Sequence, residues 1–470
     1  MLGLLLPVAL AADPAATLAD MDWDAATEEV AHVLAHYLQA DTTNPPGNET
    51  VGAQVLARVL AAEGIPSEIW EPEPGRGNLI ARLPATAPDG EGALCLLSHL
   101  DVVTSEPERW HPDHPPLSGH IAPDDDGVLS VWGRGALDMK GLGAMELMTL
   151  VWLKRLGVPL SRDVVLIAVS DEEVYNTGAQ MLAEQRLPEL GCSHVLNEGG
   201  LGVEGALFEG QTLFPISVGE KGALWVRMVA TGAPGHGSVP RPGEAPQRLI
   251  AAMNALNAYD PDPVFHPALV ELLDAAGEAQ GGAPGFVMTH PALARGLLRG
   301  TLMANPATRA TLIDTVHITG MEGANEPNVV PSEVAALLDC RLLPDTTPEQ
   351  MLARLEALVD DPEVRFEVIS AQQGNVSAWR GDPLYDALAR HIAATWPEAA
   401  VGPYVSVGFT DSIYLRPHGV QAFGMMPVSV PPELLETMHG DDERMPVEEL
   451  GKGLRVVLSV VIEVAGAEDS

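Results

Sequence analysis

The sequence predicts an α/β protein built on a mixed sheet, with a smaller ferredoxin-like α+β domain inserted into it. Three observations support this. Short apolar strands alternate with helices up to about residue 214, a βαββαβ order follows between 215 and 372, and helix–strand alternation resumes at Pro383. A chain of 470 residues is also too long for one ordinary core, so two domains are expected.

The larger domain is expected to comprise residues 13–214 and 373–470. Apolar residues at helical spacing predict helices, and short apolar runs predict strands. The expected helices are 24–39, 51–63, 143–156 and 179–185. The expected strands are 79–81, 94–97, 164–169 and 194–196.

The inserted domain is expected to comprise residues 215–372. Its expected strands are 223–229, 316–318, 334–342 and 364–369, and its expected helices are 245–258 and 348–359. The Pro- and Gly-rich stretch 261–285 is expected to be an insertion loop with helical pieces.

The N-terminus resembles the apolar end of a signal peptide, so residues 1–12 are a candidate signal-peptide remnant. Ala9-Leu10-Ala11 would serve as the cleavage site, although no basic residues precede the apolar run. The run is too short to span a bilayer. Both export, to the periplasm or medium, and a cytoplasmic location stay open.

The chain has three cysteines, and each lies in an apolar run: Cys95, Cys192 and Cys340. An odd and sparse set does not predict a disulfide framework. All three are therefore expected to be buried free thiols.

The strongly acidic composition excludes two classes of partner. The formal net charge is −39, from 26 basic and 65 acidic side chains. Nucleic acid and anionic lipid both require clustered Lys and Arg. A solubilising acidic surface is the favoured interpretation, and a saline habitat also fits.

Five short segments carry acidic or imidazole groups in a pattern that indicates a metal site. They are His99-Leu100-Asp101, residues 133–141 (GRGALDMKG), Asp171-Glu172-Glu173, Asn197-Glu198-Gly199-Gly200 and Met438-His439-Gly440. The first four lie at or near the carboxyl ends of expected strands, where sites assemble in open α/β sheets. So many acids need a cation to offset their repulsion, and mixed His and carboxylate ligands suit zinc.

These segments, in this order, resemble the two-zinc family of aminoacylases and carboxypeptidases. The family includes acetylornithine deacetylase, succinyl-diaminopimelate desuccinylase, glutamate carboxypeptidase and carboxypeptidase S. The resemblance extends from about Thr43 to His439. It implies a zinc-exopeptidase catalytic domain, an inserted lid or dimerisation domain, and a homodimer.

The resemblance also implies two ligand sets that share one carboxylate. They are His99, Asp138 and Glu198 for one zinc ion, and Asp138, Glu173 and His439 for the other. Cobalt or manganese could replace zinc in the assay tube. Asp101 is expected to accept the second ring N–H of His99, and the peptide bond after Asp138 is expected to be cis, as in relatives.

Glu172 is left without a metal, and the resemblance makes it the general base. It would take a proton from the water that bridges the two metals and pass it to the leaving nitrogen. The alternative is a solvated neighbour of Glu173. Adjacent residues on an extended segment point apart, which would let Glu172 and Glu173 divide the two tasks.

The inserted domain and a C-terminal loop supply the remaining candidates. The Gly235-His236-Gly237 segment resembles the family segment whose His stabilises the oxyanion, the alternative being a turn histidine. Asn328 and Arg341 match the family pattern, and Arg341 could bind a substrate carboxylate or form an ion pair at the edge of the core. Thr410 lies in a loop that matches the family's substrate loop.

The expected reaction is hydrolysis of an amide or peptide bond beside a free carboxylate. A glutamate before Gly199 favours an acylase or carboxypeptidase over an aminopeptidase, and the insertion most resembles carboxypeptidase S. N-acyl amino acids, dipeptides and longer peptides all fit as substrates.

Two other classes of function were weighed. Residues 200–205 match a dinucleotide fingerprint, but residues 211–215 cannot form the helix that must follow. A non-catalytic binding or scaffold protein would also keep this fold. The intact set of five ligands and Glu172 argues against it.

Overall fold

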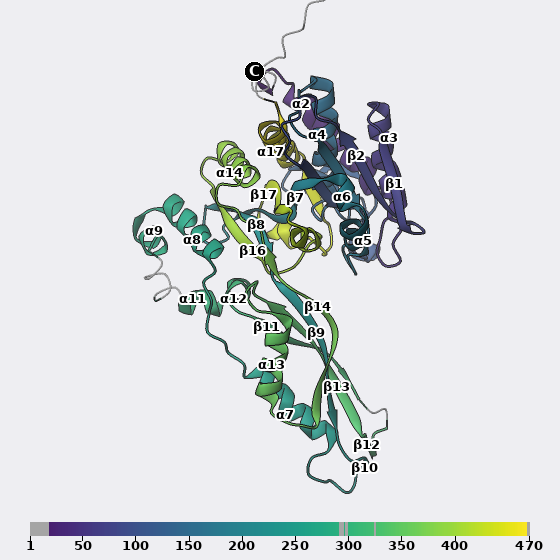
Figure 1. Ribbon diagram of the computed structural model, residues 1–470, viewed down its shortest axis with the longest axis vertical. Helices are drawn as coiled ribbons and strands as arrows, with labels where there is room; N and C mark the ends of the chain where they lie inside the picture. Colours follow the sequence, from purple (N-terminus) through teal and green to yellow (C-terminus); the bar gives the residue numbers. More distant parts are fainter. Residues whose placement is uncertain (1–17, 291–295, 297–298, 324–325, 468–470) are drawn as a thin grey trace, which may run out of the picture. The chain divides into compact units, whose positions relative to one another are not determined.

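The computed structural model describes residues 18–290, 296, 299–323 and 326–467 (Figure 1). The chain divides into two compact units. Unit 1 contains residues up to Ser217, Ser377–Gly402 and the chain from Thr410 onwards, and unit 2 contains Val218–Val376 and Pro403–Phe409. Val218–Val376 lies within a few residues of the expected insertion 215–372, whereas Pro403–Phe409 was expected in the larger domain. The candidate signal-peptide segment 1–12 lies outside the described residues.

A nine-stranded mixed sheet is the main feature of the chain, which confirms the predicted α/β class. The strand order is β1-β2-β6-β3-β7-β17-β8-β15, and β16 pairs with β8. β3 runs parallel to both β6 and β7, whereas β2 runs antiparallel to β6. The strands are β1 (Ser67–Glu73), β2 (Arg76–Leu83), β3 (Ala93–His99), β6 (Val164–Val169), β7 (Cys192–Glu204), β8 (Thr212–Glu220), β15 (Asn375–Val376), β16 (Ala400–Ser406) and β17 (Gln421–Val430).

Helices cover both faces of this sheet because its central strands are apolar on both faces. Every residue of β3 and β6 is buried. Residues of β3 and β6 that include Leu97 and Ile167 pack with α5 (Thr177–Gln185) and α6 (Leu187–Leu190). On the other face, α4 (Lys140–Leu156) packs on β3 and β6, and α17 (Val447–Ala465) packs on α4, α2 (Trp23–Leu38) and β17.

The remaining elements of unit 1 are short or lie at the sheet's margins. α3 (Glu49–Ala62) packs on β1 and β2, and α14 (Pro383–Thr395) packs on α17. A separate three-stranded sheet has the order β18-β5-β4. Its strands are β4 (His120–Pro123), β5 (Leu129–Trp132) and β18 (Arg444–Pro446), and the short helices are η1 (Pro107–Arg109), α15 (Ser412–Leu415), η2 (Arg416–His418) and α16 (Pro432–Leu435).

Unit 2 contains the expected βαββαβ order. Its four-stranded sheet has the order β11-β13-β9-β14, and every neighbouring pair is antiparallel. Two helices, α7 and α13, contribute to a common core with this sheet. The elements are β9 (Gly222–Thr231), α7 (Ala245–Asn257), β11 (Thr315–Glu322), β13 (Glu333–Leu342), α13 (Pro348–Val359) and β14 (Val364–Gln372).

The stretch expected to be an insertion loop is more helical than predicted. It forms α8 (Pro267–Gln280) and the start of α9 (Gly282–Met288), and α11 (Arg299–Ala304) and α12 (Pro306–Leu312) follow. Pro267 stands at the first position of α8, where its missing N–H costs no hydrogen bond. Gly277 lets α9 approach closely, because an added Cβ there would lie 2.9 Å from the Gly285 carbonyl oxygen.

The prediction of three free thiols is wrong. Cys95 and Cys192 form a disulfide with a Cα–Cα distance of 5.7 Å, and only Cys340 is a free buried thiol. Cys95 lies in β3 and Cys192 begins β7, so the bond joins two neighbouring parallel strands. Their separation of 97 residues hides this proximity in the sequence, because sheet pairing alone brings them together.

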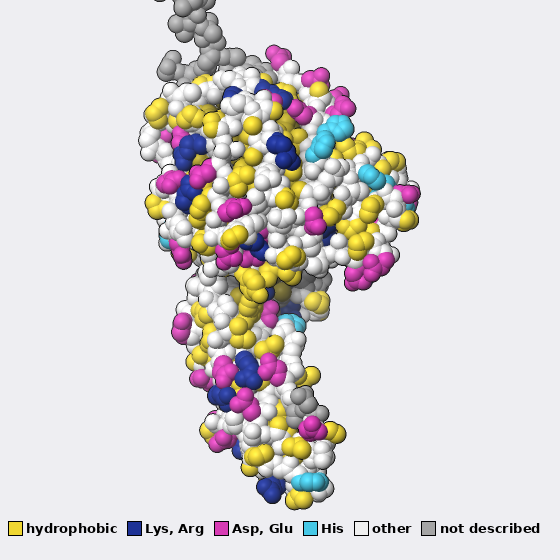
Figure 2. All heavy atoms as spheres, turned by 90° about the vertical axis from the view of Figure 1, so that its right-hand side faces the viewer, with side chains coloured by type: hydrophobic (Ala, Val, Ile, Leu, Met, Phe, Trp, Pro, Cys, Tyr) yellow, Lys and Arg dark blue, Asp and Glu magenta, His cyan; other side chains and the backbone are white. Residues whose placement is uncertain are grey.

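The distribution of charged side chains can be followed on one face of the molecule (Figure 2). Figure 2 shows acidic side chains dispersed over the visible face and interspersed with basic ones. A dispersed distribution agrees with the solubilising role favoured from the sequence. Among the described residues, no helix is both long enough and apolar enough to cross a membrane.

One buried acid in α4 gives a pH-dependent prediction for stability. Glu146 is fully buried, and burial raises its pKa well above the usual glutamate range. The native state therefore keeps a proton that the unfolded chain releases, so this group's contribution to stability falls as the pH rises above the unfolded pKa. Glutamine does not titrate, so Glu146→Gln removes this pH-dependent loss of stability. We expect the unfolding free energy of the variant to rise relative to that of wild type between pH 5 and pH 8, by at most about 1.4 kcal/mol per pH unit.

Urea unfolding at several pH values in that range would measure the difference between variant and wild type. The matched control is Glu184→Gln, because Glu184 is an exposed glutamate on α5. The control should show a difference that does not change with pH. A Glu146→Gln difference that is equally flat would contradict the buried, protonated state of Glu146.

Candidate metal centre

Three neighbouring parallel strands bring most of the predicted ligands to one edge of the sheet. β6, β3 and β7 are adjacent, and β3 ends at His99. Asp171-Glu172-Glu173 follows the end of β6, and Glu198 lies within β7. Because the carboxyl ends of parallel strands meet at one edge, these side chains converge although they come from distant parts of the sequence.

Asp138 lies between the two predicted histidine ligands. Its Oδ1 is 3.1 Å from Nε2 of His99, and its Oδ2 is 3.0 Å from Nε2 of His439. His439 Nε2 is also 3.2 Å from Oε2 of Glu173. Each oxygen of Asp138 thus faces a different histidine. The peptide bond between Asp138 and Met139 is cis, as predicted.

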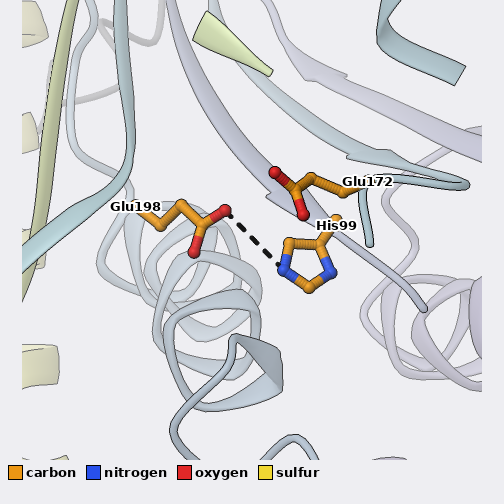
Figure 3. A group of neighbouring side chains, drawn as sticks. All are labelled: His99, Glu172 and Glu198. Carbon is orange, nitrogen blue, oxygen red and sulfur yellow. Dashed lines mark ion pairs between the residues drawn. The ribbon is translucent and has the colours of Figure 1, made fainter. Parts of the chain in front are cut away.

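Glu198 and Glu172 flank the His99 ring. His99 Nε2 is 3.7 Å from Oε1 of Glu198, and Figure 3 shows both carboxylates turned towards the space beside the ring. Within the described part of the chain, two groups of side chains present ligand atoms that all lie within 4.8 Å of one another. They are His99, Glu172 and Glu198, and His99, Asp138 and Glu173. These distances alone therefore do not decide whether Glu172 acts as a general base or as a metal ligand.

The electrostatics of this cluster favour a bound cation. Burial, reinforced by repulsion from Glu198, raises the pKa of Glu172 well above its usual range. Burial also raises the pKa of Glu198 and of Glu173, with Asp138 adding repulsion to both. Hydrogen bonds that the His439 ring donates to Asp138 and Glu173 raise the pKa of His439 to about 10. The four neighbouring carboxylates, Asp138, Glu172, Glu173 and Glu198, would ionise together more readily beside divalent cations.

The carboxylate of Asp101 holds the segment that carries Glu172 and Glu173. Its Oδ1 accepts the backbone N–H of Glu172 at 3.0 Å, and its Oδ2 accepts that of Glu173 at 3.1 Å. Nδ1 of His99 lies closer to the main-chain oxygen of Asp101, at 3.0 Å, than to the carboxylate, at 3.6 Å. Asp101 thus orients His99 mainly through its backbone, while its carboxylate orients the segment after β6.

Asn44 extends this support behind the site, and the sequence analysis did not identify it. Its side-chain amide donates to Oδ2 of Asp101 and to Oδ1 of Asp171, both at 2.8 Å. Asp171 has a φ of +68°, a backbone conformation that persists only where several contacts over-determine it. Its carboxylate also pairs with Arg76 at 2.5 Å. Asn44 precedes two prolines, and this local sequence carries no sign of contacts with residues so far along the chain.

Thr410 braces the strand that carries Glu198. Its hydroxyl accepts a hydrogen bond of 3.2 Å from the side chain of Asn197, the residue before Glu198, and Thr410 is only 8% exposed. Gly424 of β17 also serves this strand, because a Cβ there would lie 2.1 Å from the carbonyl oxygen of Glu198. Only glycine lets β17 lie this close to β7.

Unit 2 brings two further predicted residues together. β10 (Gly235–His236) pairs with β12 (Val329–Val330), and the amide of Gly237 donates to the carbonyl of Asn328 at 2.8 Å. His236 is exposed, and its Nδ1 accepts the backbone N–H of Ser238 at 3.2 Å. Nδ1 is therefore unprotonated, which leaves the proton on Nε2.

Arg341 forms an ion pair, which is the alternative that the sequence left open beside binding a substrate carboxylate. Its guanidinium lies 2.9 Å from Asp339, two residues earlier on β13, and stacks over the ring of Phe409 at 5.2 Å. Both contacts lie within unit 2. They fix the orientation of the guanidinium but leave some of its five donors free for a ligand.

The donor set fits a divalent metal. Imidazole nitrogens and carboxylate oxygens are the ligands that zinc takes in catalytic sites. The predicted ligands His99, Asp138, Glu173, Glu198 and His439 all lie in unit 1 and are linked by the distances given above. His236, Asn328 and Arg341 lie in unit 2 and are described within that unit alone.

Comparison with known proteins identifies relatives of this chain. The model of peptidase family M20/M25/M40 matches residues 95–463. The chain is 26% identical over 381 residues to human N-fatty-acyl-amino acid synthase/hydrolase PM20D1, covering 78% of this chain and 73% of that protein. It is 25% identical over 413 residues to human aminoacylase-1, covering 87% and 88%. It is 27% identical to a probable carboxypeptidase S-like 2 of Dictyostelium discoideum, covering 76% and 68%.

Solved structures share the fold. An M20 family metallo-carboxypeptidase, Sso-CP2 from Sulfolobus solfataricus, superposes with a TM-score of 0.69 at 18% identity, covering 93% of this chain and 99% of that one. Human carnosine dipeptidase 1 superposes with a TM-score of 0.64 at 15% identity, covering 96% and 98%. With a family model that matches most of its length, the chain belongs to the M20/M25/M40 peptidase family and is a metal-dependent hydrolase.

Proposed function

We propose that this chain is a two-zinc hydrolase that cleaves an amide or peptide bond beside a free carboxylate. The observation that carries the proposal is the position of Asp138, whose two oxygens face His99 and His439 separately. A carboxylate placed in this way suits a bridging ligand. Two zinc ions held there would polarise the scissile carbonyl and lower the pKa of the attacking water.

Glu172 is the proposed general base. It takes a proton from the attacking water as the water oxygen bonds to the carbonyl carbon, and it gives that proton to the nitrogen when the C–N bond breaks. Its carboxylate lies among the donor atoms of His99 and Glu198, within reach of a water in that space. The hydrogen bond from its own N–H to Asp101 fixes the backbone from which it projects.

His236 is the proposed donor to the oxyanion. The hydrogen bond from the Ser238 N–H to Nδ1 leaves Nε2 as the N–H donor, which is the tautomer this role needs. Arg341 and Asn328 are proposed to bind the substrate carboxylate, since a planar guanidinium matches a carboxylate in a bidentate arrangement. A homodimer is proposed on the family resemblance.

N-acyl amino acids and peptides with a free C-terminus are the proposed substrates. The relatives of this chain include an aminoacylase and a probable carboxypeptidase S-like protein, and both names denote cleavage of such bonds. A turnover assay on N-acetyl amino acids and dipeptides would test this. Each substrate is paired with its C-terminal amide, which removes the free carboxylate and keeps the scissile bond.

The metal requirement is tested in the same assay. We expect about two zinc ions per chain, loss of turnover with a chelator, and recovery with zinc, cobalt or manganese. Equal turnover of acids and C-terminal amides would refute the carboxylate requirement. A chain that binds no metal and hydrolyses nothing after zinc is restored would instead support the non-catalytic alternative.

A further inference from the structure

We propose that Glu443 is a positioning residue that locks the segment of Asp138 to the segment of His439 and so sets the geometry of the metal that both would hold. The inference rests on the proposed two-metal function. It concerns a side chain that touches neither substrate nor metal in that function. The contacts of Glu443, Arg134 and the two ligand segments carry the argument.

The carboxylate of Glu443 accepts four hydrogen bonds from one short segment. Oε1 accepts the backbone N–H groups of Leu137 at 2.7 Å and of Asp138 at 3.1 Å. Oε2 accepts the backbone N–H of Gly135 at 2.9 Å and the guanidinium of Arg134 at 2.6 Å. A buried carboxylate with its lone pairs satisfied in this way fixes the backbone that donates to it.

Arg134 completes the link in the opposite direction. Its guanidinium also donates to the carbonyl oxygen of Gly440, the residue after His439. The backbone carbonyl of Glu443 accepts the N–H of Gly133 at 3.0 Å. Arg134 is 2% exposed and Glu443 is fully buried, so water does not compete for these bonds.

The position of this cluster explains why it would matter for the metal. β5 ends at Trp132, two residues before Arg134, and β18 begins at Arg444, directly after Glu443. The two strands pair, with Trp132 opposite Arg444. The hydrogen bonds of Glu443 thus continue that pairing up to the two ligands, across a separation of 305 residues between Asp138 and Glu443.

His439 needs such support more than the other ligands do. Its φ is +57°, and its side chain is 53% exposed, whereas His99 is fully buried in β3. A residue held in the left-handed region persists only when its surroundings over-determine it. The Arg134–Gly440 bond and the Glu443 contacts supply that constraint on the C-terminal side of His439.

The test compares Glu443→Gln with wild type by cobalt and zinc titration of the purified full chain. The amide nitrogen of glutamine cannot accept the N–H groups that one carboxylate oxygen now accepts. We expect the zinc ion assigned to Asp138, Glu173 and His439 to bind about 10–100-fold more weakly. At limiting free zinc the content should fall from two ions towards one, and the visible absorption bands of the cobalt form should shift. Turnover should fall through kcat more than through KM.

Glu449→Gln is the matched control. Glu449 also accepts a backbone N–H, that of Ser429 at 2.7 Å, and pairs with Lys452, yet within the described part of the chain it makes no bond to a ligand segment. The control should keep the wild-type cobalt spectrum and zinc content. Arg134→Lys is the second variant, because it keeps the charge but loses the planar fork that reaches both Glu443 and Gly440. It should shift the cobalt spectrum in the same direction.

The outcomes separate the two proposals. A folded Glu443→Gln with wild-type cobalt spectrum, zinc affinity and kcat overturns the positioning role and leaves the two-metal function intact. If Glu443→Gln does not fold, Arg134→Lys decides, and a wild-type cobalt spectrum in that variant overturns the role. A wild-type chain that binds no cobalt refutes the two-metal function, and the positioning role with it.

Discussion

Glu172→Gln is expected to lower kcat by about 10²–10⁴-fold while the chain keeps both metal ions. The amide matches the carboxylate in shape but cannot accept the proton of the attacking water. Metal content by mass spectrometry and kcat on the best substrate of the panel are the two measurements. They must be made on the same preparation, because each role of Glu172 predicts a different combination.

Glu173→Gln is the sharp comparison for this experiment. Glu173 is adjacent in sequence, yet its Oε2 lies 3.2 Å from Nε2 of His439, in the predicted position of a ligand. The glutamine at 173 should reduce the metal content, whereas the glutamine at 172 should not. If Glu172→Gln also lost a metal ion, Glu172 would be a ligand, as its proximity to His99 and Glu198 allows. Near-normal turnover with both metals bound would eliminate it as the base.

Asp138→Ala is expected to abolish the binding of both metal ions and, with it, all turnover. The reason is that each oxygen of Asp138 faces a different histidine, so one substitution removes a ligand from both sets. Zinc content after dialysis against limiting free zinc would measure the loss. Asp125→Ala, at an exposed position outside the site, is the control and should retain two ions.

Thermal unfolding gives an independent measure of the same loss. Zinc should stabilise the wild-type chain by about RT ln(1 + [Zn]/Kd), or roughly 2.7 kcal/mol at a free zinc concentration 100 times Kd. The Asp138→Ala chain should gain almost nothing from zinc. Without metal, the variant should be less stable than wild type, because alanine cannot accept the hydrogen bonds of His439 and His99, which hold the pKa of Asp138 below its usual range despite its burial. A variant that still binds two ions would refute the bridging role.

The local pattern of the sequence was sufficient for most of the fold. Periodicities of 2.0 and 3.6 residues are local properties, and they correctly predicted strands such as β6 and helices such as α4. These periodicities did not predict β17, because Gly424 and Pro427 interrupt the apolar pattern of a buried strand. Gly424 is there because β7 and Glu198 lie against it, which is a tertiary cause. They also underestimated α8, because Gly277 serves its packing on α9.

The candidate site was predictable for a similar reason. His99, Glu173 and Glu198 lie at or near the carboxyl ends of neighbouring strands, so the order of strands and acids along the chain places them at one edge of the sheet. Asp138 and His439 lie in turns, and only the family resemblance singled them out.

The side chains that support the ligand segments could not be predicted in this way. Asn44, Arg134 and Glu443 act through hydrogen bonds to segments far away in the sequence, and a lone Asn, Arg or Glu carries no signal of such a partner.

By itself, then, the sequence determined the fold class and the inserted ferredoxin-like order, and its resemblance to the family singled out the candidate metal ligands. Only the tertiary structure decided that Cys95 bonds to Cys192, that the carboxylate of Asp101 supports Glu172 and Glu173, and that Glu443 joins the segments of Asp138 and His439. The physical reason is the distance along the sequence over which each interaction acts. Element type follows from neighbours within a few residues, whereas a disulfide or a buried hydrogen bond depends on which distant segments the sheet brings together.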